Sequence, residues 1–140
     1  MQVHSYLMFN GRTEEALEFY KKAIGAKVEM MMRFKDAPEG ACTPGTENKV
    51  MHSSFKVGDT MLMASDGMMN GAPLEFKGIS LTLNPKTEAE CERLFAALAE
   101  GGQVFQPLIK TFFSPKFGVL ADKFGVNWML LVEQDMVKAA

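Results

Sequence analysis

A chain of 140 residues, 47% hydrophobic and 23% charged, has the balance of one globular domain and excludes a disordered polypeptide. Its formal net charge of −2, with Lys and Arg scattered along the chain, argues against a nucleic-acid surface. The apolar stretches are about one strand long, too short for the roughly 20 residues of a membrane helix, and residues 1–5 lack the basic start of a signal peptide. We therefore expect a cytoplasmic protein.

The first half of the chain predicts the element order strand, helix, strand, strand, strand. Alternating residues over 3–9 predict the first strand. Helically spaced apolar residues over 14–24 predict an amphipathic helix, with Thr13 as its N-cap and Gly25 as its end. Three further strands are predicted at residues 27–34, 50–57 and 60–65, with a Pro- and Gly-rich loop at 36–49.

The second half repeats this order. Thr87 and Glu90 match the capping box of a helix that Gly101 stops. Four strands are predicted at residues 79–83, 104–109, 117–121 and 126–132. The two expected helix caps lie 87 − 13 = 74 residues apart, and the first strands of the two halves lie 79 − 3 = 76 residues apart.

These offsets predict an internal repeat within one domain, 1–140. The first βαβββ module is expected at 1–66 and the second at 78–134. Each module would leave one apolar face of an open sheet uncovered. We therefore predict an α+β fold whose two curved sheets form a cavity.

Five short motifs follow one another in a characteristic order. They are EEALEFY at 14–20, GA at 25–26, HSSF at 52–55, SD at 65–66 and DKFGVNW at 122–128. With these motifs the chain resembles the vicinal-oxygen-chelate superfamily, which includes glyoxalase I, bleomycin-resistance proteins and extradiol dioxygenases. It resembles more closely the PhnB-like branch, often labelled 3-demethylubiquinone methyltransferase-like. The resemblance implies a glyoxalase-like fold and a homodimer.

The resemblance also bears on metal binding. Metal-dependent members place four ligands in the cavity, from the first and the last strand of each half. His4 stands at one such position, but Gly78, Met61 or Met63, and Leu131 stand at the others. Divalent metals of this family need imidazole and carboxylate ligands. We therefore expect no metal and no cofactor, with a divalent metal disfavoured.

The methyltransferase label has no support in the sequence. A nucleoside cofactor would need a glycine-rich turn between a strand and a helix. Residues 10–12, Asn-Gly-Arg, carry a single glycine.

His52 is the first candidate for a functional side chain, and His4 is the second. His52 shares a strand face with Val50, Ser54 and Lys56. If this face lines the cavity, the imidazole would serve as a base or as a hydrogen-bond donor. The alternative is a histidine that is simply hydrogen-bonded within a half-buried sheet.

The apolar lining of the cavity is expected to include Met61, Met63, Phe113 and Trp128, although ordinary core packing explains them equally well. Two aspartates, Asp66 and Asp122, are expected to bond their own turns. Two cysteines suit a reducing compartment: Cys42 in the long loop and Cys91 on the apolar side of the second helix.

Three functions stay open at this point. The first is a binding protein for a small, partly apolar molecule, with His52 as the polar anchor. The second is a lyase or isomerase that uses His52, and His4 with or without a metal, as acid and base. The third is a structural or interaction protein whose cavity is filled.

Overall fold

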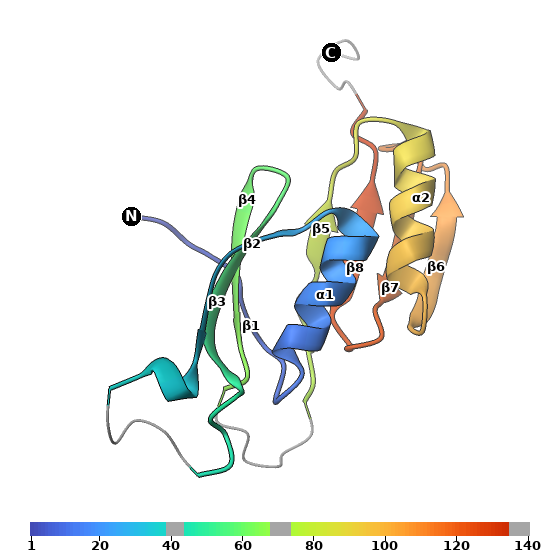
Figure 1. Cartoon of the computed structure of the whole chain (residues 1–140). Coiled ribbons are helices and arrows are strands. Elements are labelled where there is room, and N and C mark those ends of the chain that lie inside the picture. Colours follow the sequence, from blue (N-terminus) through green and yellow to red (C-terminus); the bar gives the residue numbers. More distant parts are fainter. Residues whose placement is uncertain (39–43, 68–73, 135–140) are drawn as a thin grey trace. The chain divides into compact units, whose positions relative to one another are not determined.

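A computed structural model describes residues 1–38, 44–67 and 74–134, and the chain divides into two compact units, Met1–Leu74 and Glu75–Ala140 (Figure 1). The two units have the same order of strands and α-helix, and the first unit adds a 3-10 helix. The modules predicted at 1–66 and 78–134 fall within them. No helix of the described residues is long and apolar enough to cross a membrane.

The first unit is a four-stranded sheet with one long helix. Its elements are β1 (Tyr6–Met8), α1 (Thr13–Ile24), β2 (Lys27–Arg33), the 3-10 helix η1 (Phe34–Asp36), β3 (Val50–Val57) and β4 (Thr60–Ser65). The strand order is β1-β4-β3-β2, with β1 parallel to β4 and the other pairs antiparallel.

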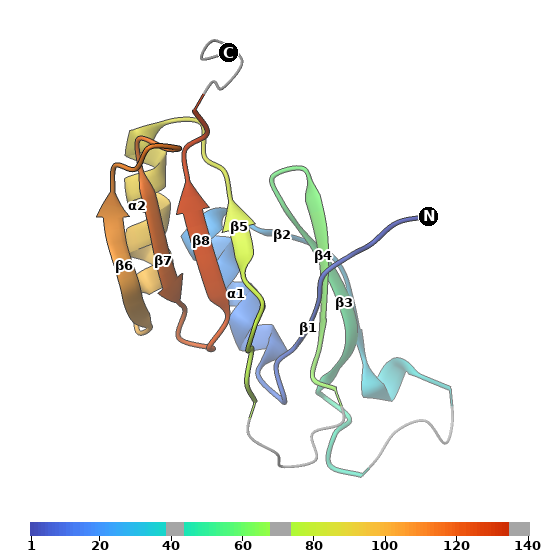
Figure 2. The ribbon, with the colours of Figure 1, turned by 180° about the vertical axis from the view of Figure 1, so that it is seen from behind.

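The second unit repeats this topology, and Figure 2 shows its four strands side by side with the helix behind them. Its elements are β5 (Leu81–Leu83), α2 (Glu88–Ala99), β6 (Gln103–Ile109), β7 (Phe117–Ala121) and β8 (Asn127–Leu131). The strand order is β5-β8-β7-β6. The predicted α+β architecture of two such sheets is confirmed.

Each predicted helix and strand is present, and the first strand of each unit is shorter than predicted. β1 spans Tyr6–Met8 instead of 3–9, and β5 spans Leu81–Leu83 instead of 79–83. Each pairs with one neighbour over three residues only. Alternation predicts an extended backbone, but the length of a strand depends on its partner.

The start of α1 differs from the prediction. Arg12 is the N-cap and Thr13 is the first helical residue, and the buried Oγ1 of Thr13 has no hydrogen-bond partner among the residues that the structure describes. Asp66 replaces the expected cap, because its Oδ1 accepts hydrogen bonds from the backbone N–H groups of Gly11 (3.0 Å) and Thr13 (2.9 Å). At α2 the predicted cap is confirmed, since Thr87 Oγ1 accepts from Glu90 N at 3.1 Å.

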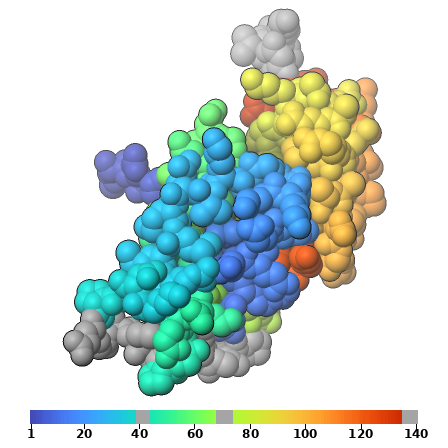
Figure 3. Space-filling view, in the orientation of Figure 1, coloured from blue at the N-terminus to red at the C-terminus, as the bar shows by residue number. Residues whose placement is uncertain are grey.

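The core of the first unit lies between α1 and one face of its sheet. The ring of Tyr20 on α1 stacks on Phe55 of β3 with a centroid distance of 6.2 Å and an interplanar angle of 11°. Arg33 of β2 pairs with Glu14 of α1 at 2.6 Å and lowers the pKa of that carboxyl. Figure 3 shows the surfaces of α1 and β2 side by side. The opposite face of the sheet is therefore the open one.

The core of the second unit lies between α2 and its own sheet. The side chains buried there include Cys91, Leu98, Leu120, Trp128 and Leu130. A methyl group added to Gly118 would come within 2.6 Å of the Phe95 ring of α2. Glycine at this position therefore allows the helix to approach β7 closely.

We expect Cys91 to resist thiol reagents in the native protein. Its side chain is fully buried, and burial raises the pKa of the thiol, so little of the reactive thiolate is present at neutral pH. The test uses a Cys42→Ser variant, so that Cys91 is the only thiol. Labelling by a chromogenic disulfide is expected to be at least about 100-fold slower in buffer than in urea, where Cys91 is exposed. Equal rates would contradict the burial of Cys91. Cys42 lies outside the described residues.

Candidate ligand-binding face of the first sheet

The open face is defined here as the face of the first sheet opposite α1. Paired residues in neighbouring strands share a face, so rows of side chains can be followed across the sheet. Three rows lie on the open face: Met32–His52, Met30–Ser54–Met63–Tyr6, and Lys27–Lys56–Met61. The predicted residues His52, Met61 and Met63 thus come together on one face.

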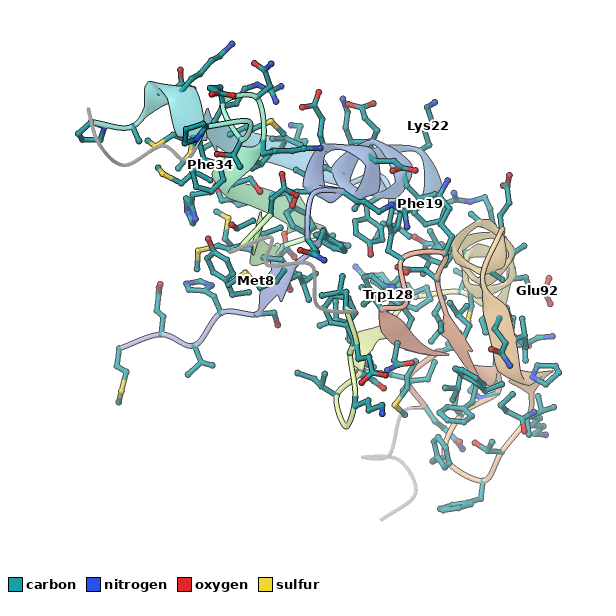
Figure 4. All side chains as sticks on the ribbon, turned by 90° about the horizontal axis from the view of Figure 1, so that it is seen from below. Met8, Phe19, Lys22, Phe34, Glu92 and Trp128 are labelled. Carbon is teal, nitrogen blue, oxygen red and sulfur yellow. The ribbon has the colours of Figure 1, made fainter. Side chains whose placement is uncertain are left out.

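The open face is rich in methionine. Among the described residues, five methionines lie on it: Met8, Met30, Met32, Met61 and Met63. Met8 and Met30 are 46% and 40% exposed, which is high for such side chains. Figure 4 shows Met8 on the side of the sheet away from α1, whereas Lys22 lies on the outer side of that helix. Flexible thioethers make an apolar surface that adapts to different shapes.

A tyrosine–histidine pair lies within this apolar surface. The Tyr6 hydroxyl and His52 Nδ1 are 2.8 Å apart, and the two rings stack with a centroid distance of 5.6 Å and an interplanar angle of 29°. When the phenol donates, the imidazole keeps its proton on Nε2. Among the described residues, His52 Nε2 has no hydrogen-bond partner, so it is available to a bound molecule.

His4 lies at the edge of the same sheet, but its ring is engaged locally. Its Nε2 lies 2.9 Å from Gln2 Oε1, and its Nδ1 lies 3.4 Å from the backbone oxygen of Met61. A hard divalent metal needs several nitrogen and oxygen donors together. In the described part of the chain no three His, Cys, Asp or Glu side chains form a metal-binding group. Those residues of this unit that the structure describes therefore do not fit a glyoxalase-type metal.

The other predicted lining residues belong to the second unit. Phe113 packs edge-on against Phe117 of β7 with a centroid distance of 5.2 Å. Trp128 is 2% exposed, and its Nε1 donates to Asp122 Oδ2 at 2.9 Å. Since Trp128 lies in the core behind the sheet, we do not include it in the candidate face.

Sequence reasoning missed Tyr6 and Met30. The alternation of β1 groups His4, Tyr6 and Met8 on one side, which was a usable signal. It does not reveal the partner of Tyr6, because His52 lies 46 residues away and two strands across.

The chain is similar to one protein family and to several solved structures over most of its length. The family model described as 3-demethylubiquinone-9 3-methyltransferase matches residues 1–131. Protein PA1353 from Pseudomonas aeruginosa is 44% identical, with 96% of this chain and 99% of that chain covered and a TM-score of 0.84. A putative 3-demethylubiquinone-9 3-methyltransferase, PhnB protein, from Bacillus cereus is 32% identical, with 94% and 99% covered and a TM-score of 0.79. A glyoxalase-related enzyme from Fulvimarina pelagi shares the fold, at 20% identity, 95% and 88% coverage and a TM-score of 0.61.

Proposed function

Because this chain belongs to the 3-demethylubiquinone-9 3-methyltransferase family, the PhnB-like branch of the vicinal-oxygen-chelate superfamily, we propose that it binds a small, partly apolar molecule. The proposed site is the open face of the first sheet. The thioethers contact the apolar body of the ligand, and His52 Nε2 bonds its polar group. The Tyr6–His52 hydrogen bond carries this proposal, since it fixes one polar anchor in an apolar surface. We propose that the protein acts as a homodimer.

Methyl transfer, which the family description names, finds no support at the turn between β1 and α1. A nucleoside cofactor bound at the turn between β1 and α1 would need free backbone N–H groups. Those of Gly11 and Thr13 already donate to the Asp66 carboxylate. We therefore assign no methyl-transfer step to this turn.

The Tyr6–His52 pair also supports a second function, as a lyase or isomerase. When the Nδ1–H group instead donates to the phenol oxygen, Nε2 carries a lone pair and can take a proton from carbon and return it. In that case a bound carbon acid exchanges hydrogen for deuterium in D₂O, and His52→Gln stops the exchange while binding persists.

The binding proposal is tested by screening small apolar acids, amides and alcohols with protein labelled at the methionine methyl groups. We expect ligands to shift the methyl NMR signals of Met30 and Met63. The variant Met63→Gln should weaken binding about fivefold or more, because it replaces apolar contact surface.

Met31→Gln is the matched control, because Met31 pairs with Ser53 and points to the α1 side of the sheet. It is expected to leave the affinities unchanged. Elemental analysis with a metal titration of wild type, His4→Ala and His52→Ala gives an independent check. A stoichiometric metal that is lost in either variant would contradict binding without a metal.

A further inference from the structure

Two lysines lie directly opposite each other at one end of the open face. Lys27 of β2 is the Cα partner of Lys56 of β3, and Lys56 is the partner of Met61 of β4. Side chains at such positions start from Cβ atoms about 4.5–5.5 Å apart, and like charges there are destabilising. Among the described residues no carboxylate lies within 4.0 Å of either ammonium group. The described residues therefore leave this basic pair without an ion-pair partner.

This arrangement differs from other lysines of the chain. Lys21 pairs with Glu18 at 3.1 Å, and Lys116 pairs with Glu92 at 2.8 Å. A β-bulge in β2 between Val28 and Met30 places Lys27 on the same face as Met30. The extra residue of the bulge is Glu29, which is exposed and forms no ion pair with Lys27 or Lys56 among the described residues. The backbone irregularity thus keeps a basic pair next to the methionines.

We propose that the ligand of the open face is an amphipathic organic anion whose acidic group lies between Lys27 and Lys56. This inference rests on the proposed function and names the ligand class. The apolar body runs from the lysine row across Met30 and Met63 towards His52. Neighbouring rows are separated by two residues along a strand, about 6.7 Å, so the three rows accommodate a medium-length hydrocarbon. An anionic group between the two ammonium groups relieves their repulsion and forms two charge-assisted hydrogen bonds.

The test compares octanoate with octan-1-ol, which have the same hydrocarbon chain and differ in charge. Binding is followed by the methionine methyl signals of Met30 and Met63 at low and high salt. We expect octanoate to bind about tenfold more tightly than octan-1-ol at low salt, because each partly exposed charge pair contributes a factor of a few. This preference should fall at high salt, where exposed charges are screened.

The decisive variant is Lys27→Gln/Lys56→Gln, which should bind both compounds equally. It is expected to be as stable as the wild type or more so, since the repulsion is gone. Lys27→Glu should also fold, by forming an ion pair with Lys56, and should lose the preference for octanoate. Lys22→Gln on the outer side of α1 removes the same charge elsewhere and should keep the preference.

Three results would overturn the inference, and they differ in what they say of the proposed function. Equal binding of octanoate and octan-1-ol to the wild type, with shifts at Met30 and Met63, would reject the anion and retain an apolar ligand. A tenfold preference that persists in the double variant would place the acidic group elsewhere. An absence of shifts with both compounds would count against the anion and the proposed binding face together.

Discussion

Asp66→Ala is expected to lower the free energy of unfolding by about 3–5 kcal/mol. Asp66 is 2% exposed, and its carboxylate accepts hydrogen bonds from the backbone N–H groups of Gly11, Thr13 and Val50 at 3.0, 2.9 and 2.7 Å. Alanine leaves three donors in a largely buried place without their acceptor. It also removes a negative charge from the positive end of the α1 dipole. Urea denaturation followed by circular dichroism measures the loss.

The conservative variant separates hydrogen bonding from charge. Asp66→Asn keeps one oxygen acceptor but turns an N–H₂ group towards a backbone N–H. The free energy of unfolding should therefore fall by about 2 kcal/mol. Asp59→Ala, in the exposed β3–β4 turn, is the matched control and should change stability by less than about 0.5 kcal/mol. Hydrogen exchange of the Gly11, Thr13 and Val50 amides gives a local readout. Unchanged protection in Asp66→Ala would show that the carboxylate does not hold these three segments together.

Asp66 also marks a limit of sequence reasoning. A Ser-Asp-Gly sequence at the end of a strand indicates an aspartate that bonds its own turn, and that prediction is wrong. The donors lie 55, 53 and 16 residues away. Only the tertiary fold brings them to one carboxylate, so local spacing contains no signal for the contact. The capping box at Thr87 was predictable because donor and acceptor are three residues apart.

The candidate face shows the same division between local and long-range information. Alternation correctly places His52 with Ser54 and Lys56, because β3 is regular at these positions. On β2 the bulge changes the pattern, and it is Met30 that joins Lys27 on the open face. The basic pair and the methionine rows therefore depend on pairing between strands, which one sequence does not specify.

The element order was predictable because each helix and strand carries its own period and its own stop signals. Gly25 ends α1 with a left-handed conformation at φ 68°, as expected for a glycine after the last turn. The two units keep the same topology with different cores. In the first unit Tyr20 stacks on Phe55, and in the second Gly118 allows α2 to approach its sheet.

Asp122→Ala is expected to destabilise the second unit by about 3–5 kcal/mol. Asp122 is 3% exposed, and its Oδ1 accepts from the backbone N–H groups of Phe124 (2.9 Å) and Val126 (3.1 Å), as expected for a turn aspartate. Its Oδ2 accepts from Trp128 Nε1, a contact that the sequence did not indicate. Alanine thus removes the acceptor of a buried indole as well as two bonds of the turn. Trp128 is the only tryptophan, so its fluorescence in urea measures the transition of this unit.

Two variants show which bond matters more. Trp128→Phe removes the indole donor together with its packing volume, and its unfolding is followed by circular dichroism because the variant lacks the fluorescent probe. Asp122→Asn keeps an oxygen acceptor for the turn and should lose less stability than Asp122→Ala. Glu133→Ala, which removes the exposed acceptor of Asn84, is the control and should change the Trp128 transition by less than about 0.5 kcal/mol. If Asp122→Ala unfolds at the same urea midpoint as the wild type, this carboxylate does not stabilise the second unit. Because Asp66 and Asp122 belong to different units, a fluorescence transition lowered equally by Asp66→Ala and Asp122→Ala would show that the units unfold cooperatively.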